Sequence, residues 1–143
     1  MVVSHSTSMS RITPPLSSPG LSITGLVLIV DDTPANLEVI SETLSDAGFD
    51  VAIATGGDRA LQQLKHCLPD LILLDVMMAG MDGFETCRQI KANPCTEHIP
   101  IIFMTALAEV EHKVKALDLG AVDYIAKPFH EKEVLARVRI HLQ

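Results

Sequence analysis

LILLD, residues 71–75, is a run of four large apolar side chains that ends in a carboxylate. Its length and its lack of polar alternation are typical of a strand that is buried on both faces of a parallel sheet. Similar short apolar runs occur at residues 26–30, 51–54 and 101–104, and a weaker one occurs at residues 124–126. The sequence therefore predicts five strands.

Amphipathic helical patterns separate these runs. Apolar side chains recur at helical spacing in five stretches. Their members are Leu37, Ile40, Leu44 and Ala47; Ala60, Leu61, Leu64 and Leu68; Phe84, Cys87 and Ile90; Val110, Val114 and Leu117; and Val134, Leu135, Val138 and Leu142. A chain that alternates strands and helices forms a parallel sheet through right-handed crossovers. The predicted fold class is α/β, a doubly wound five-stranded parallel sheet with helices on both faces.

The composition indicates an acidic protein with a substantial core. Of the 143 residues, 48% are hydrophobic and 20% are charged, which is ordinary for one globular domain. The formal net charge of -7 repels nucleic-acid phosphates, so we expect no direct nucleic-acid binding by this segment. Residues 1–24 are rich in Ser, Thr and Pro and have no sustained period, which predicts a disordered leader before a folded domain at residues 25–143.

The cysteines and the hydropathy pattern indicate the cellular compartment in which the protein is expected. Cys67, Cys87 and Cys95 are odd in number and lack CxxC spacing, so neither a disulfide framework nor a zinc site is indicated. Residues 1–24 lack the pattern of an export signal, and no stretch approaches 18 consecutive apolar residues. We therefore expect a cytoplasmic protein with no membrane span.

Reactive side chains follow four of the five predicted strands. They are Asp31 and Asp32 after the first strand, Asp75 after the third, Thr105 after the fourth and Lys127 after the fifth. Because ligands bind beyond the carboxyl ends of parallel strands, we expect these groups to converge. Three carboxylates at one edge repel one another unless a cation lies among them, and an oxygen-only set suits Mg²⁺. A carboxylate can also attack phosphorus, and the cations and the hydroxyl would then compensate the charge of the product.

Each of these residues also has a simpler interpretation. The aspartates and Thr105 could cap helices or turns, and Lys127 could be a solvated surface charge. Taken singly, such roles are as common as functional ones. Their coincidence at successive strand ends is much less expected, so the set as a whole indicates a phosphoryl-transfer site.

The motifs around these residues resemble those of response-regulator receiver domains of two-component signal transduction. The resemblance extends over about residues 26–142. Its motifs are Val30-Asp31-Asp32 with Asn36 downstream, Leu73-Leu74-Asp75-Val76-Met77-Met78, Met81-Asp82-Gly83, Met104-Thr105-Ala106, Gly120-Ala121-Val122-Asp123-Tyr124 and Lys127-Pro128-Phe129. It implies the flavodoxin-like strand order 2-1-3-4-5.

The same resemblance assigns roles to the acidic residues. It implies that Asp75 accepts a phosphoryl group from the phosphohistidine of a histidine kinase or a phosphotransfer domain. Mg²⁺ would be held by Asp31, Asp32, Asp75 and the backbone carbonyl of Met77. Magnesium is thus the expected cofactor.

A domain of this kind works as a switch and not as an enzyme on other substrates. By resemblance, Thr105 and Lys127 contact the aspartyl phosphate, Tyr124 reorients when Thr105 is drawn inward, and the Lys127-Pro128 bond is cis. The face formed by the fourth helix, fifth strand and fifth helix would change, and a homodimer could form through it. The still periodic fifth helix favours a longer parent, such as a hybrid kinase or a multidomain regulator.

Two other classes of protein stay open. A phosphatase of the haloacid-dehalogenase kind also uses a strand-end Asp, Mg²⁺, Thr and Lys, but it has a second Asp where Met77 stands. A phosphorylation-independent interaction module would keep the fold without the chemistry. By the same resemblance, Met77 and Leu107 hold the two positions, two residues after Asp75 and Thr105 respectively, whose side chains influence attack by water. Neither side chain can hydrogen-bond a water molecule, which predicts a long-lived phosphoryl group.

Overall fold

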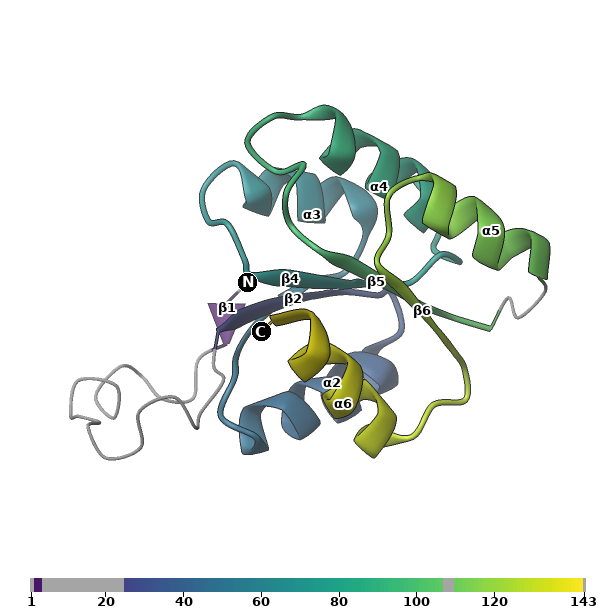
Figure 1. Ribbon diagram of the computed structural model, residues 1–143. Helices are drawn as coiled ribbons and strands as arrows, with labels where there is room; N and C mark the ends of the chain where they lie inside the picture. The colour runs from purple at the N-terminus through teal and green to yellow at the C-terminus, as the bar shows by residue number, and fades with distance from the viewer. Residues whose placement is uncertain (1, 4–24, 107–109, 143) are drawn as a thin grey trace.

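The computed structural model describes residues 2–3, 25–106 and 110–142. These residues form a sheet with helices on both of its faces (Figure 1). The strands are β1 (Val2–Val3), β2 (Leu26–Val30), β3 (Asp50–Ala54), β4 (Leu71–Leu74), β5 (Ile101–Thr105) and β6 (Asp123–Ala126). The helices are α2 (Pro34–Asp46), α3 (Gly57–Leu64), α4 (Gly83–Ala92), α5 (Val110–Asp118) and α6 (Glu131–Leu142).

The sheet confirms the predicted topology. Its parallel strands lie in the order β3-β2-β4-β5-β6, which is the expected order 2-1-3-4-5. In Figure 1, α3, α4 and α5 cover one face of the sheet, and α2 and α6 cover the other. Strand order reverses between β2 and β4. The carboxyl ends of these two strands therefore border the crevice in which such sheets bind ligands.

The sheet also has one strand that the sequence did not predict. β1 pairs antiparallel with β3, with Val2 opposite Ala52 and Val3 opposite Val51. The expectation of a disordered leader is therefore wrong for residues 2–3, while residues 4–24 lie outside the described residues. A two-residue strand is too short to show a period, and it forms here because the outer edge of β3 offers backbone groups for pairing.

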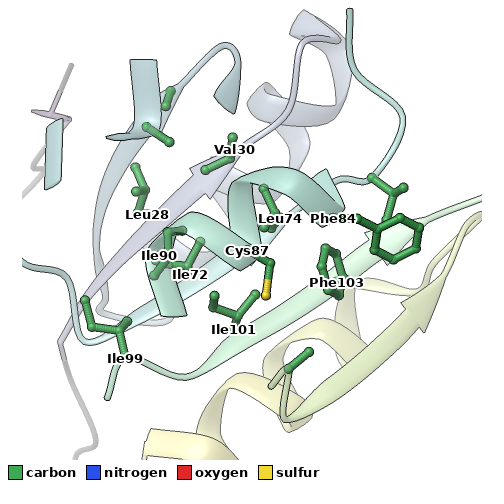
Figure 2. Packing of buried hydrophobic residues seen from close by; sticks show 14 of the residues in the cluster. Leu28, Val30, Ile72, Leu74, Phe84, Cys87, Ile90, Ile99, Ile101 and Phe103 are labelled. Carbon is green, nitrogen blue, oxygen red and sulfur yellow. The ribbon is translucent and has the colours of Figure 1, made fainter. Parts of the chain in front are cut away.

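The burial of the central strand β4 explains why residues 71–74 lack polar alternation. Ile72 and Leu74 point into the core beneath α3, α4 and α5, whereas Leu71 and Leu73 point into the core on the α2 and α6 side. All four side chains are at most 1% exposed. Figure 2 shows the first of these cores, where Ile72 and Leu74 lie near Phe84 and Cys87. Helices on both faces therefore require apolar residues at every position of the strand.

Helix α2 forms where the sequence predicted it. Pro34 occupies its first turn, where a missing N–H costs nothing, and Leu37, Ile40 and Leu44 are buried against the sheet. Gly48 follows the helix with φ +98°, the left-handed conformation that commonly ends helices at glycine. Within the described residues, no helix is both long and apolar enough to cross a membrane.

Helix α5 differs from the sequence-based expectation in the face that it buries. The apolar residues Val110, Val114 and Leu117 are 73%, 50% and 53% exposed, while the small side chain of Ala116 is fully buried. The periodic stripe thus located the helix but not its contact with the sheet. Because Ala116 lets the helix backbone lie close to the core, the larger residues are left facing outward.

Candidate functional site

The register of β2 and β4 brings Asp31 and Asp75 together. Val30 pairs with Leu74 at the ends of these strands, and the backbone N–H of Asp75 donates to the Val30 carbonyl at 2.9 Å. The residue that follows each strand is an aspartate, Asp31 after β2 and Asp75 after β4, so both side chains lie at one point of the sheet edge. Asp31 is 2% exposed and Asp75 is 5% exposed. Two carboxylates are thus buried side by side, which requires nearby positive charge.

A third carboxylate completes an acidic cluster. Asp31, Asp32 and Asp75 each offer an oxygen within 4.8 Å of those of the other two, and Asp32 is exposed. Burial raises the pKa of Asp75 above its usual value, and the Asp31 charge adds to this effect although Lys127 opposes it. An oxygen-only set of this size, open to solvent on one side, is suited to a hard divalent cation.

Lys127 supplies the positive charge that the structure contains. Its Nζ lies 3.1 Å from Asp31 Oδ2 and 3.3 Å from Asp75 Oδ2. The residue follows β6, and its backbone N–H donates to the Thr105 carbonyl at 2.9 Å, which ties it to the end of β5. The Lys127-Pro128 peptide bond is cis, as the resemblance implied. The interpretation of Lys127 as a solvated surface charge is therefore wrong.

Thr105 and Tyr124 lie on the two strands next to this cluster. Thr105 is the last residue of β5 and is fully buried. Tyr124 lies on β6 opposite Phe103, with their ring centroids 6.4 Å apart, and Lys113 Nζ lies 5.9 Å from the tyrosine ring. Thr105 and Tyr124 thus lie on neighbouring strands, two positions apart in the register. Their switching roles stay predictions.

Further groups hold the acidic side chains in place. The Thr33 N–H donates to Asp31 Oδ1 at 2.8 Å, and Asn36 Nδ2 donates to Asp31 Oδ2 at 3.3 Å. The Ala79 N–H donates to Asp32 Oδ2 at 3.0 Å. Sequence reasoning assigned none of these contacts. A backbone N–H donor can belong to any residue type, so the sequence does not reveal it. Asn36 is part of the receiver-domain motif, but the sequence alone did not predict a role for its side chain.

The capping interpretation of the buried aspartates is partly correct. Asp75 Oδ1 accepts from the Met77 N–H at 3.3 Å, and Asp31 accepts from the residue two positions on in the same way. These contacts are those of an aspartate that stabilises a turn. The other oxygen of each residue faces Lys127, so capping and charge pairing occur together. That the Met77 carbonyl binds metal stays a prediction.

Gly83 allows α4 to begin directly against the phosphoacceptor candidate. A Cβ at this position would meet the carbonyl oxygen of Asp75 and would lie 2.7 Å from Val76 Cα. The preceding residue, Asp82, caps the helix by accepting from the Glu85 N–H at 2.8 Å. Glycine is therefore required at this position by the close approach of the backbone, and not by a positive φ.

The raised pKa of Asp75 predicts a pH-dependent stability in metal-free protein. A carboxyl whose pKa is higher in the folded state destabilises the fold when ionised, and this cost disappears as pH falls through that pKa. We therefore expect Asp75→Asn to melt about 4 °C above wild type at pH 7, equivalent to ~1 kcal/mol. The difference should shrink as pH falls towards the ordinary value of 3.8. Thermal unfolding in EDTA from pH 7 down to about pH 3.5 measures it, and a constant difference over this whole range would contradict this account.

The fold and this site together define a class of protein. The chain belongs to the response regulator receiver domains, whose family model matches residues 27–139. It is 42% identical over 113 residues to the response regulator PleD of Caulobacter vibrioides, a match that covers 79% of this chain and 25% of that protein. It is 40% identical over 117 residues to the DNA-binding dual master transcriptional regulator RpaA of Synechocystis sp., covering 82% and 48%. The chain thus spans half or less of the length of these relatives.

Solved structures show the same fold. The chemotaxis protein CheY4 of Vibrio cholerae superimposes with a TM-score of 0.80 at 31% sequence identity, covering 83% of this chain and 99% of that one. The signal receiver domain of a signal transduction histidine kinase from Syntrophus aciditrophicus gives a TM-score of 0.77 at 35% identity, covering 82% and 89%. The fold of this chain is thus found both in a chemotaxis protein and in the signal receiver domain of a histidine kinase.

Proposed function

We propose that this receiver domain is a phosphorylation-operated switch in which Asp75 takes a phosphoryl group from the phosphohistidine of a histidine kinase or a phosphotransfer domain. The observation that carries the proposal is the position of Asp75. It is buried at the sheet crevice, next to two further carboxylates and within 3.3 Å of a lysine ammonium. Mg²⁺ is the proposed cofactor, held by Asp31, Asp32, Asp75 and the Met77 carbonyl, where it would neutralise charge on the transferring phosphoryl group.

The residues of the chain act around the transfer step in distinct ways. A carboxylate oxygen of Asp75 attacks phosphorus while the bond to the histidine nitrogen breaks, and the electron pair stays on that nitrogen. Lys127, which now bridges Asp31 and Asp75, would contact the new phosphate, because its ammonium already lies beside the attacking group. The Thr105 hydroxyl would donate to a phosphate oxygen. These proposed roles need no second substrate, so the domain is proposed as a switch and not as an enzyme.

The output of the switch is proposed to be a changed binding face over α5, β6 and α6. Thr105 ends β5 and Tyr124 lies on the neighbouring strand β6, so a shift of the threonine would reach this face. The face carries the exposed apolar residues Val110, Val114, Leu117, Val122 and Ile140. A protein partner, including a second copy of the chain, would bury them. The net charge of -7 argues against DNA as the partner of this segment.

The proposed compartment is the cytoplasm. Cys67, Cys87 and Cys95 are all free thiols in the structure, and two of them are exposed. Exposed unpaired thiols are typical of proteins in a reducing compartment.

A small phosphodonor tests the function without knowledge of the kinase. We expect the domain to gain the mass of one phosphoryl group when incubated with acetyl phosphate and Mg²⁺, and to gain none when EDTA removes the metal. Intact-mass spectrometry measures both results, with another receiver domain as a positive control. If that control is modified and this domain is not, phosphoryl acceptance is wrong and an interaction module becomes the better interpretation.

Met77 offers a test of phosphoryl lifetime. Its side chain follows Asp75 by two residues, is 57% exposed and cannot orient a water molecule. Replacing it with Gln should shorten the phosphoryl half-life by about threefold or more, because water positioning is a large part of hydrolysis. Decay of the phosphorylated mass after removal of acetyl phosphate measures the half-life, with Met77→Leu as the matched control. An equal half-life in Gln and Leu variants would exclude this explanation.

A further inference from the structure

A cavity of about 540 Å³ lies between α3 and α4, which run side by side on one face of the sheet (Figure 1). Its volume is within the range of small-molecule sites. It is lined by Leu61, Leu64, Lys65, His66, Cys67, Leu68, Gln89, Ile90, Asn93, Cys95 and Thr96. None of these residues belongs to the phosphoryl-transfer site. The cavity therefore needs an explanation of its own.

The cavity combines apolar walls with a positive side. Leu64 and Ile90 are buried and contribute to the core, whereas Leu68 is 49% exposed. Lys65 and His66 are exposed cationic or protonatable groups, and none of the lining residues is acidic. In a chain with a net charge of -7, an acid-free lining with a lysine is a local exception. The lining thus complements a molecule that is apolar at one end and anionic at the other.

Two of the other polar side chains of the lining already have partners. Thr96 Oγ1 donates to the Ile90 carbonyl at 2.7 Å, and Asn93 Oδ1 accepts from the Cys95 N–H at 2.8 Å. Lys65, in contrast, forms no ion pair with any residue that the structure describes. Its ammonium is therefore available to an anionic ligand and, unlike the neighbouring His66 imidazole, is a permanent charge at neutral pH.

We propose that this cavity binds a small amphiphile, with its apolar body against Leu64 and Ile90 and its anionic headgroup beside Lys65. The site lies away from the acidic cluster along the same helix. α4 begins at Gly83 against Asp75, and the cavity is lined by the end of α4 from Gln89 onward. Binding of the amphiphile requires no phosphoryl group, so this inference stands apart from the proposed phosphorylation.

The cysteines make the binding position measurable. Cys67 and Cys95 both line the cavity and are exposed, whereas Cys87 is fully buried in the core. Iodoacetamide should therefore label the first two thiols in the folded protein and leave the third unlabelled. A ligand in the cavity should slow labelling of both exposed thiols.

The probe is anilinonaphthalenesulfonate, whose aromatic body and sulfonate match the proposed class, and phenylnaphthylamine serves as its uncharged analogue. We expect the sulfonate to bind saturably, with at least about threefold higher affinity than the analogue, and to slow labelling of Cys67 and Cys95. Lys65→Glu should weaken sulfonate binding by about three- to tenfold without weakening that of the analogue. Lys132→Glu, an equal charge change on α6, should leave both affinities unchanged.

Three results would overturn the proposal. The first is the absence of saturable sulfonate binding to folded protein. The second is saturable binding without protection of Cys67 and Cys95, which would place the probe elsewhere, for example on the exposed face of α5. The third is equal loss of sulfonate affinity in Lys65→Glu and Lys132→Glu, which would reflect net charge alone. Circular dichroism of each variant establishes that it is folded.

Discussion

Replacing Asp75 with asparagine is expected to abolish phosphoryl uptake from acetyl phosphate, with a loss of at least about 100-fold in rate. The amide has no anionic oxygen to attack phosphorus. The fold should survive, because the asparagine oxygen can still accept from the Met77 N–H that bonds Asp75 Oδ1. Loss of the charge also removes the cost of burying it and the repulsion from Asp31, so the metal-free variant should melt above wild type. Mass spectrometry and thermal unfolding of the same sample measure both effects.

Asp82→Asn is the matched control for this substitution. Asp82 lies on the same loop and caps α4 by accepting from the Glu85 N–H, a role that asparagine fills equally well. We expect this variant to be phosphorylated at a rate close to that of wild type. Undiminished phosphoryl uptake in Asp75→Asn would show that Asp75 is not the phosphoacceptor. Equal loss in both variants would instead indicate a general disturbance of the loop.

Replacing Gly83 with alanine is expected to destabilise the domain by about 3 kcal/mol. The added methyl group would meet backbone atoms of Asp75 and Val76, and backbone atoms cannot move aside as a flexible side chain can. Either α4 must shift or the end of β4 must distort. Since β4 is the buried central strand of the sheet, both responses are costly. Urea unfolding followed by circular dichroism gives the change in free energy.

Gly56→Ala provides the comparison for Gly83→Ala. A Cβ at Gly56 would have nothing within 4 Å, and the backbone there is extended, which any residue adopts. We expect its effect on the free energy of unfolding to be below about 1 kcal/mol. A similar small effect of Gly83→Ala would show that the start of α4 has room to move. The close approach to Asp75 would then have no structural importance.

The sequence predicted the parts of this protein that depend on residue type and period. The apolar run at residues 71–74 is buried on both faces, as its lack of polar alternation predicted. Asp31 and Asp75 were then placed together by topology alone, because both follow neighbouring parallel strands. Lys127 was placed correctly for the same reason. Strand ends are predictable because a parallel sheet brings them all to one edge.

Features that depend on the backbone or on three-dimensional fit escaped prediction. The Ala79 N–H that holds Asp32 could belong to any residue type, so no pattern marks it. β1 is too short to show a period, and its pairing depends on the exposed edge of β3. For α5 the sequence predicted a buried face that the structure does not have. Val110, Val114 and Leu117 have helical spacing, but their side chains do not face the core. Exposure of such a stripe fits a binding face better than a core.

The central claim is that the phosphoryl group is carried as an acyl phosphate on Asp75. Borohydride reduces an acyl phosphate to an alcohol and so converts the aspartate that carries it to homoserine. After incubation with acetyl phosphate and Mg²⁺, followed by reduction, peptide mass spectrometry should find homoserine at position 75 and aspartate at positions 31, 32 and 82. Homoserine at one of those other positions, or a phosphoryl group that resists reduction because it is attached to a hydroxyl or an imidazole, would contradict the account.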